Sequence, residues 1–264
     1  MNILVRELKA NIKSLIIWGV IVVLLIAVGF SKFSAYYNNP EMLAILDELP
    51  SAMTWALNLQ AFNLTTISGF YGIMFTYFAL LLSISAAMWG SDIISKEERD
   101  KTVEFALTLP VTRSKLITAK TVAAVINCIA LLLITWGITL VSSQSYQPDR
   151  DFYEFQTLGM LALFIIQMIF LAVGVFLGCA MKQYKRAGSV AVSLLLGTYF
   201  ISIISSLNKN LEFLKYFSPF KYFDPATLLH ESKLDMLFVG LAAGIIAVSL
   251  VGAYFTYSKR DLYI

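Results

Sequence analysis

Long apolar runs separated by short polar segments dominate this chain. Each run approaches the roughly 20 residues that one α-helix needs to cross a hydrocarbon core of about 30 Å. Helices suit this environment because they satisfy their backbone hydrogen bonds internally. The pattern therefore predicts an all-α integral membrane protein, built as a single transmembrane domain over residues 1–264. The six predicted membrane spans are residues 15–31, 64–90, 116–143, 154–180, 187–207 and 236–257.

Three segments outside the spans carry patterns of their own. Residues 1–14 place Leu4, Leu8 and Ile12 at i, i+4 and i+8, which predicts an amphipathic helix lying on the membrane surface before the first span. Residues 41–62 are rich in apolar residues and predict a helical hairpin on the outer surface. Residues 211–229 are aromatic and interrupted by prolines, which predicts a broken interfacial or re-entrant element before the last span.

Composition agrees with lipid as the solvent of this fold. The chain is 58% hydrophobic and 14% charged, with a mean hydropathy of +0.74, whereas soluble domains are about 45–50% apolar and about 25% charged. The net charge is only +3 and the basic residues are dispersed among short loops, so we expect no nucleic-acid partner.

The distribution of basic residues predicts the orientation in the membrane. Of the 20 Lys and Arg residues, 14 fall in segments 1–14, 91–120, 181–188 and 258–264, which alternate with the other loops. By the positive-inside rule these segments and both termini face the cytoplasm. We therefore expect a multi-pass protein of the cell membrane.

Candidate catalytic and metal-binding groups are sparse. The sequence has no phosphate-binding loop with a Gly-x-x-x-x-Gly-Lys-[Ser/Thr] pattern. His230 is the only histidine and falls in an outer loop, while Cys128 and Cys179 fall inside apolar runs and are expected to pack as small hydrophobic residues. We expect no catalytic site, no metal site and no cofactor bound by this chain.

The polar residues inside the predicted spans are uncharged, and they permit two interpretations. Small residues at four-residue spacing, as in Gly174 with Gly178 and Gly240 with Gly244, let helices pack closely. Alternatively, hydroxyls and amides could line a translocation path for an amphipathic, lipid-like or peptide-like cargo. The residues to which both interpretations apply are Ser68, Thr76, Asn127, Gln167, Ser189, Ser193 and Ser202.

The largest polar stretch on the predicted inner side is residues 91–115. Its first half is charged, and its second half is apolar and ends at Pro110, which predicts a short amphipathic helix along the membrane face. A solvated connector that only enforces topology is an equally open interpretation.

Within this stretch, Glu98 to Lys120 (ERDKTVEFALTLPVTRSKLITAK) resembles the cytoplasmic coupling segment of ABC-2 type permeases. The shared features are an acidic-basic cluster, Gly-Thr or Lys-Thr, a Glu, apolar residues, Leu-x-x-Pro-Val-[Ser/Thr]-Arg, and a Lys that opens the next helix. Lys101 stands where many members have glycine. The six spans, the amphipathic start, the aromatic loop before the last span and the basic tail are also similar to that family.

The resemblance implies a non-catalytic exporter permease whose coupling helix docks in a groove of a separate ATPase, which binds ATP and Mg. It also implies two ATPase copies and a second permease copy or a paralogue, all working at the lipid membrane. Arg113 would pair with acids or cap the third span. A motor-independent secondary carrier or a membrane scaffold is the alternative. The coupling residues implied by the resemblance are Glu97, Glu98, Arg99, Thr102, Val103, Glu104, Phe105, Leu107, Pro110 and Arg113.

Overall fold

A computed structural model describes residues 3–39, 62–99, 112–207 and 209–259. Within these ranges the chain forms only helices, and six of them are long and apolar enough to cross a membrane. They contain 24 to 34 residues, so they measure about 36 to 51 Å and extend beyond a hydrocarbon core of about 30 Å. The six predicted spans are thereby confirmed. The bounds are α1 Ile3–Tyr36, α4 Ile67–Arg99, α6 Arg113–Ser143, α7 Arg150–Ala180, α8 Tyr184–Leu207 and α10 Met236–Lys259.

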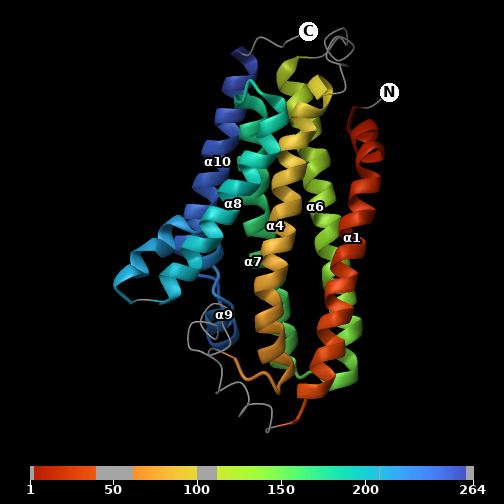
Figure 1. Cartoon of the computed structure of the whole chain (residues 1–264), viewed down its shortest axis with the longest axis vertical. Coiled ribbons are helices and arrows are strands. Elements are labelled where there is room, and N and C mark those ends of the chain that lie inside the picture. Colours follow the sequence, from red (N-terminus) through yellow and green to blue (C-terminus); the bar gives the residue numbers. More distant parts are fainter. Residues whose placement is uncertain (1–2, 40–61, 100–111, 208, 260–264) are drawn as a thin grey trace.

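The six helices form an elongated bundle with α4 and α7 at its centre (Figure 1). The helices α6 and α1 lie on one side of this pair, and α8 and α10 lie on the other. Successive helices alternate in direction, so the start of α1, the end of α4, the start of α6 and the end of α10 share one end of the bundle (Figure 1). We call this the inner end, after the orientation that the basic residues predict.

The first helix differs from the prediction. Instead of a surface helix followed by a span, α1 is one continuous helix from Ile3 to Tyr36. Its first turns bury Glu7 and Asn11 against the bundle, while Ile12 is 53% exposed. Part of the reason is electrostatic, because Glu7 forms an ion pair with Lys120 of α6. Leu4 and Leu8 also pack against the core on this side of the helix.

Close packing of α4 against α7 depends on glycine. A Cβ atom at Gly174 would lie 2.5 Å from the Ala87 carbonyl oxygen, and one at Gly178 would lie 2.8 Å from the Ser91 carbonyl oxygen. No side chain fits there, so the packing role predicted for these two glycines is confirmed. Gly240 and Gly244 pack against no helix in the described part of this chain, because a Cβ atom at either would meet nothing within 4 Å, so a packing role for them stays a prediction. Four-residue spacing identifies a helix face made of small residues, but it does not identify the helix that packs against that face.

An aromatic cluster joins α1, α4 and the short 3-10 helix η2 (Gln144–Tyr146) at the outer end. The rings of Phe33 and Phe70 stack with centroids 4.4 Å apart, and the Tyr146 ring lies 4.8 Å from Phe33. The Tyr146 hydroxyl donates to the Phe30 carbonyl oxygen at 3.3 Å. These contacts fix the outer half of the bundle.

Residues 209–231 form the predicted broken element at the end of α8. It consists of 3-10 helices η3 (Lys209–Phe217) and η4 (Pro219–Lys221) and the short helix α9 (Pro225–Glu231). Proline begins both η4 and α9, where its missing N–H costs nothing.

Two hydrogen bonds fix this broken element in place. The Ser218 hydroxyl donates to the Thr198 carbonyl oxygen at 2.7 Å, which ties the element to α8. The Tyr222 hydroxyl donates to the Tyr216 carbonyl oxygen at 2.7 Å, and burial raises the pKa of the Tyr222 phenol above its ordinary value. His230 lies at its end with an exposed side chain.

Candidate transport cavity

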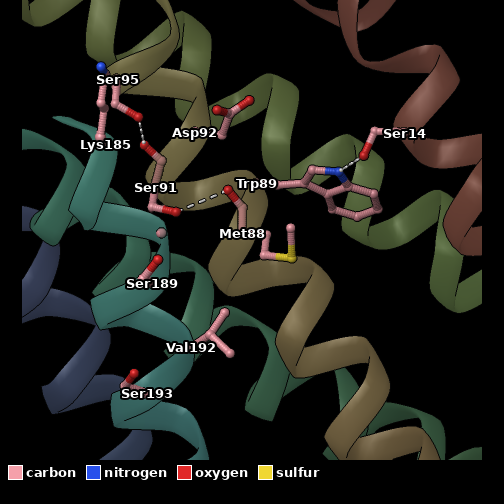
Figure 2. Close-up of a pocket in the computed structure, with 11 residues that line it drawn as sticks. Ser14, Met88, Trp89, Ser91, Asp92, Ser95, Lys185, Ser189, Val192 and Ser193 are labelled. Atoms are coloured by element: carbon pink, nitrogen blue, oxygen red, sulfur yellow. Dashed lines mark hydrogen bonds between the residues drawn. The ribbon is translucent and has the colours of Figure 1, made fainter. Parts of the chain in front are cut away.

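A cavity of about 760 Å³ opens between α4 and α8 in the inner half of the bundle (Figure 2). We call it the inner cavity. One helical face of α4 and one of α8 form most of its lining, and α1 adds Ser14. The lining residues from the two main helices are Met88, Trp89, Ser91, Asp92, Ser95, Lys185, Gly188, Ser189, Val192 and Ser193.

The α4 wall presents hydrogen-bond acceptors to the cavity. The Ser91 hydroxyl donates to the Ala87 carbonyl oxygen at 2.9 Å, and the Ser95 hydroxyl donates to the Ser91 carbonyl oxygen at 2.7 Å. A hydroxyl that donates its hydrogen to a carbonyl of its own helix can still accept a hydrogen bond through its oxygen lone pairs. The carboxylate of Asp92 also lines this wall, and Lys185 of α8 lines the same cavity.

Trp89 connects the cavity to α1. Its indole Nε1 donates to the Ser14 hydroxyl oxygen at 2.8 Å (Figure 2), and the residue is 4% exposed. An indole N–H needs a partner when it is buried, and this partner lies on a different helix. The position of α1 beside the cavity is therefore linked to the α4 wall.

Asp92 and Lys185 make the inner cavity more polar than the sequence indicated. The sequence predicts a path lined only by hydroxyls and amides, because the apolar run of the second span ends at residue 90. The helix instead continues to Arg99, which carries Asp92 into the cavity wall beside the serines. The spacing of Ser91, Asp92 and Ser95 after the apolar run was the available signal for this extension.

A second cavity, of about 50 Å³, lies further out between α4, α8 and the broken element. Thr76 of α4 and Ser202 of α8 line it, as do Lys221 and Asp224, whose side chains form an ion pair at 3.1 Å. Polar side chains of α4 and α8 thus line two separate spaces along one helix pair.

The predicted polar residues of the spans fall into three environments. Ser189 and Ser193 line the inner cavity, and Thr76 and Ser202 line the outer one. Asn127 of α6 is buried, as is Gln167 of α7. Ser68, near the outer end of α4, is half-buried.

The amides of Asn127 and Gln167 lie in the packed interior. Within the part of the chain that the structure describes, Asn127 Nδ2 and both amide atoms of Gln167 have no hydrogen-bond partner. These two residues line neither of the cavities described above.

The coupling segment predicted by resemblance is described at its two ends. Glu97, Glu98 and Arg99 continue α4 as its last residues. Arg113 begins α6, and its guanidinium Nη1 donates to the Tyr257 carbonyl oxygen at 3.2 Å, at the end of α10. Arginine is well suited to satisfy the free carbonyls of a helix end. The remaining predicted residues lie outside the described ranges: Thr102, Val103, Glu104, Phe105, Leu107 and Pro110.

Neither cysteine is part of a site. Cys128 and Cys179 are fully buried and are not joined by a disulfide, which agrees with their predicted packing role. Among the described residues, no group of three or more His, Cys, Asp or Glu side chains is placed to hold a metal ion.

Comparison with known proteins identifies the family of the whole chain. No curated protein matches the sequence. The family described as ABC-2 family transporter protein matches residues 1–262, which include every helix of the bundle and both ends of the predicted coupling segment. This chain therefore belongs to the ABC-2 transporter family and is a multi-pass membrane protein of the kind that forms the membrane subunits of ABC transporters.

Proposed function

We propose that this chain is the permease subunit of an ATP-driven ABC exporter, which couples hydrolysis by a separate ATPase to export of an amphipathic cargo. The observation that carries the proposal is the inner cavity, which is lined by the same helix that leads into the predicted coupling segment. Asp92 and Ser95 lie in the cavity wall, and α4 ends at Arg99, directly before residues 100–111. A displacement of that segment would reach the cavity through a single continuous helix.

The partner in this proposal is an ABC ATPase, because ABC-2 permeases typically pair with such subunits. ATP and Mg would bind to the partner. Charged residues such as Glu104 would set the register at a polar rim, while Phe105 and Leu107 would fill a groove. Two ATPase copies and two permease copies, identical or paralogous, would complete the transporter, since six spans are few to enclose a path.

The cargo class follows from the lining of the inner cavity. Its volume of about 760 Å³ lies within the range of about 300–1,000 Å³ that is usual for small-molecule sites. Asp92 and the serines suit a polar head with hydrogen-bond donors, whereas Met88 and Val192 suit an apolar portion. A lipid-like, drug-like or peptide-like amphiphile has this division.

The proposed location is the cell membrane, with both termini and residues 91–115 in the cytoplasm. Cysteine labelling of intact cells tests this orientation. Thiols introduced by Lys101→Cys and Lys259→Cys should be shielded from an impermeant reagent, and a thiol introduced by Asp149→Cys should react. The reverse pattern would contradict the orientation.

The function is tested by coexpressing this chain with a candidate ABC ATPase and measuring copurification and ATP hydrolysis in proteoliposomes. Phe105→Ala should weaken retention of the ATPase about thirtyfold, because truncating a central interface anchor often costs about 2 kcal/mol. Glu104→Gln should retain the ATPase but reduce its stimulation. Phe200→Ala is the matched control, because Phe200 lies on α8 with its ring 60% exposed.

Two outcomes would overturn parts of the proposal. If Phe105→Ala and Glu104→Gln both bind and stimulate the ATPase like the wild type, residues 97–113 are a solvated connector. Cargo movement in vesicles that contain this chain without any ATPase would instead identify a motor-independent carrier.

A further inference from the structure

A buried ion pair near the inner end joins three helices. Lys120 Nζ of α6 lies 3.3 Å from Glu7 Oε1 of α1 and donates to the Ile93 carbonyl oxygen of α4 at 2.7 Å. The side chains of Lys120 and Glu7 are 1% and 5% exposed. We infer that Glu7 and Lys120 are positioning residues that clamp the first turns of α1 to the two helices flanking residues 100–111. We call this contact the inner clamp.

The inner clamp lies close to both ends of the predicted coupling segment. Ile93 precedes the end of α4 at Arg99 by less than two turns, and Lys120 follows the start of α6 at Arg113 by about two turns. The chain between these ends is residues 100–112. A displacement of that stretch would move the ends of α4 and α6. The ion pair between the Lys120 ammonium group and Glu7 would then move α1 with them.

The first turns of α1 lead in turn to the inner cavity. Ser14 follows Glu7 by about two turns on the same helix, and its hydroxyl accepts the hydrogen bond from Trp89 in the cavity wall (Figure 2). Thus α1 is attached to the flanks of the coupling segment at Glu7 and to the cavity at Ser14. The clamp allows α1 to move together with α4 and α6.

Stability alone does not account for such a pair. Removing two charges from water is costly, and apolar residues of similar volume often replace a buried ion pair with no loss of stability. Apolar residues cannot form the ion pair from the Lys120 ammonium to the Glu7 carboxylate or its hydrogen bond to the Ile93 carbonyl oxygen. This difference allows a positioning role to be separated from a purely structural one.

The experiment compares single and double variants of the full chain in lipid nanodiscs. Glu7→Leu removes the carboxylate that faces the buried Lys120 ammonium and should lower the Tm by about 10 °C. Lys120→Met leaves the buried Glu7 carboxylate with the partly exposed Arg6 guanidinium at 3.3 Å and should lower the Tm by less. The double variant removes both charges and should recover most of that loss. The matched control is Arg150→Gln with Glu154→Gln, an exposed ion pair at 3.0 Å on α7, which should change nothing.

Hydrogen exchange of the backbone amides of residues 3–14 separates the two roles. If the ion pair contributed only to stability, the exchange rates of these amides would not change in the double variant. In the double variant these amides should exchange at least tenfold faster than in the wild type, although the Tm is recovered. If residues 3–14 of the double variant exchange at the wild-type rate, the pair contributes only stability and the inference is wrong.

A second arm rests on the proposed function and uses the complex with the ATPase. Trapping ATP with vanadate should change exchange at residues 100–111 and at residues 3–14 in the wild type, but only at residues 100–111 in the double variant. Equal responses in both proteins would refute transmission through the clamp. If no ATPase copurifies with the wild type, the proposed function fails, and the exchange rates without ATP still decide whether the clamp exists.

Discussion

The helix α4 makes two very different interfaces along its length. Towards α7 the backbones touch, because a Cβ atom at Gly90 or Gly174 would overlap carbonyl oxygens of the facing helix. Towards α8 the same inner half of α4 borders a cavity of about 760 Å³. In lipid, helices associate through close packing and polar contacts, and not through water exclusion. We interpret the α4–α7 interface as the fixed part of the permease and the α4–α8 interface as the part that opens.

Small residues serve both interfaces for opposite reasons. Glycine removes the side chain and lets α4 and α7 meet, whereas Ser189 and Ser193 of α8 leave space that α4 does not fill. A face of small residues is therefore compatible with a tight contact and with a cavity. The residue on the facing helix decides which of the two is formed.

The largest expected effect comes from breaking the α4–α7 interface. Gly174→Val places branched carbons where even a Cβ atom lies 2.5 Å from a carbonyl oxygen, so we expect a loss of at least about 3 kcal/mol of stability and little folded protein. The measurement is the yield and Tm in nanodiscs. Gly244→Val is the control with the same helix propensity, because a Cβ atom at Gly244 meets nothing within 4 Å in the described structure. Equal stability of the two variants would disprove the fixed interface.

An intermediate effect is expected from filling the inner cavity. Ser193→Phe adds a ring to a wall residue that is exposed within the cavity, so binding of a fluorescent amphiphile should weaken at least tenfold, or about 1.4 kcal/mol. The Tm should stay near that of the wild type, because the ring enters free space. Ser193→Ala, which removes only the hydroxyl, is the control. Unchanged binding to Ser193→Phe would show that the amphiphile binds elsewhere.

The smallest expected effect concerns the link between the inner cavity and α1. Trp89→Phe removes the hydrogen bond from Nε1 to Ser14 and should cost about 1 kcal/mol. Ser14→Ala removes the same bond from the other side. Both changes abolish one interaction, and Trp89→Phe also shrinks a buried side chain, so the double variant should lose no more than Trp89→Phe alone. Additive losses in thermal unfolding would mean that the two residues act independently.

The apolar runs were sufficient to predict the helices, because membrane spans need only length and hydropathy. They were not sufficient to predict helix ends in the inner half. The apolar pattern places Asp92 in a loop, yet α4 carries it into the cavity wall, because a helix that projects beyond the hydrocarbon can hold charged side chains. Glu7 was assigned to a surface helix because its partner, Lys120, is more than a hundred residues away in the chain. Contacts of this kind depend on tertiary packing that no local pattern encodes.

The most direct test of the account locks the α4–α8 interface. A Cβ atom at Gly188 would lie 3.5 Å from the Ser91 hydroxyl oxygen, so Ser91→Cys with Gly188→Cys should form a disulfide. The lock is made in a background with Cys128 and Cys179 replaced by alanine. The measurement is ATP hydrolysis by the reconstituted complex with its ATPase, before and after reduction. We predict that the oxidised complex retains the ATPase but hydrolyses ATP at least tenfold more slowly, and that reduction restores the rate. An oxidised complex that turns over at the reduced rate would contradict the claim that this interface opens.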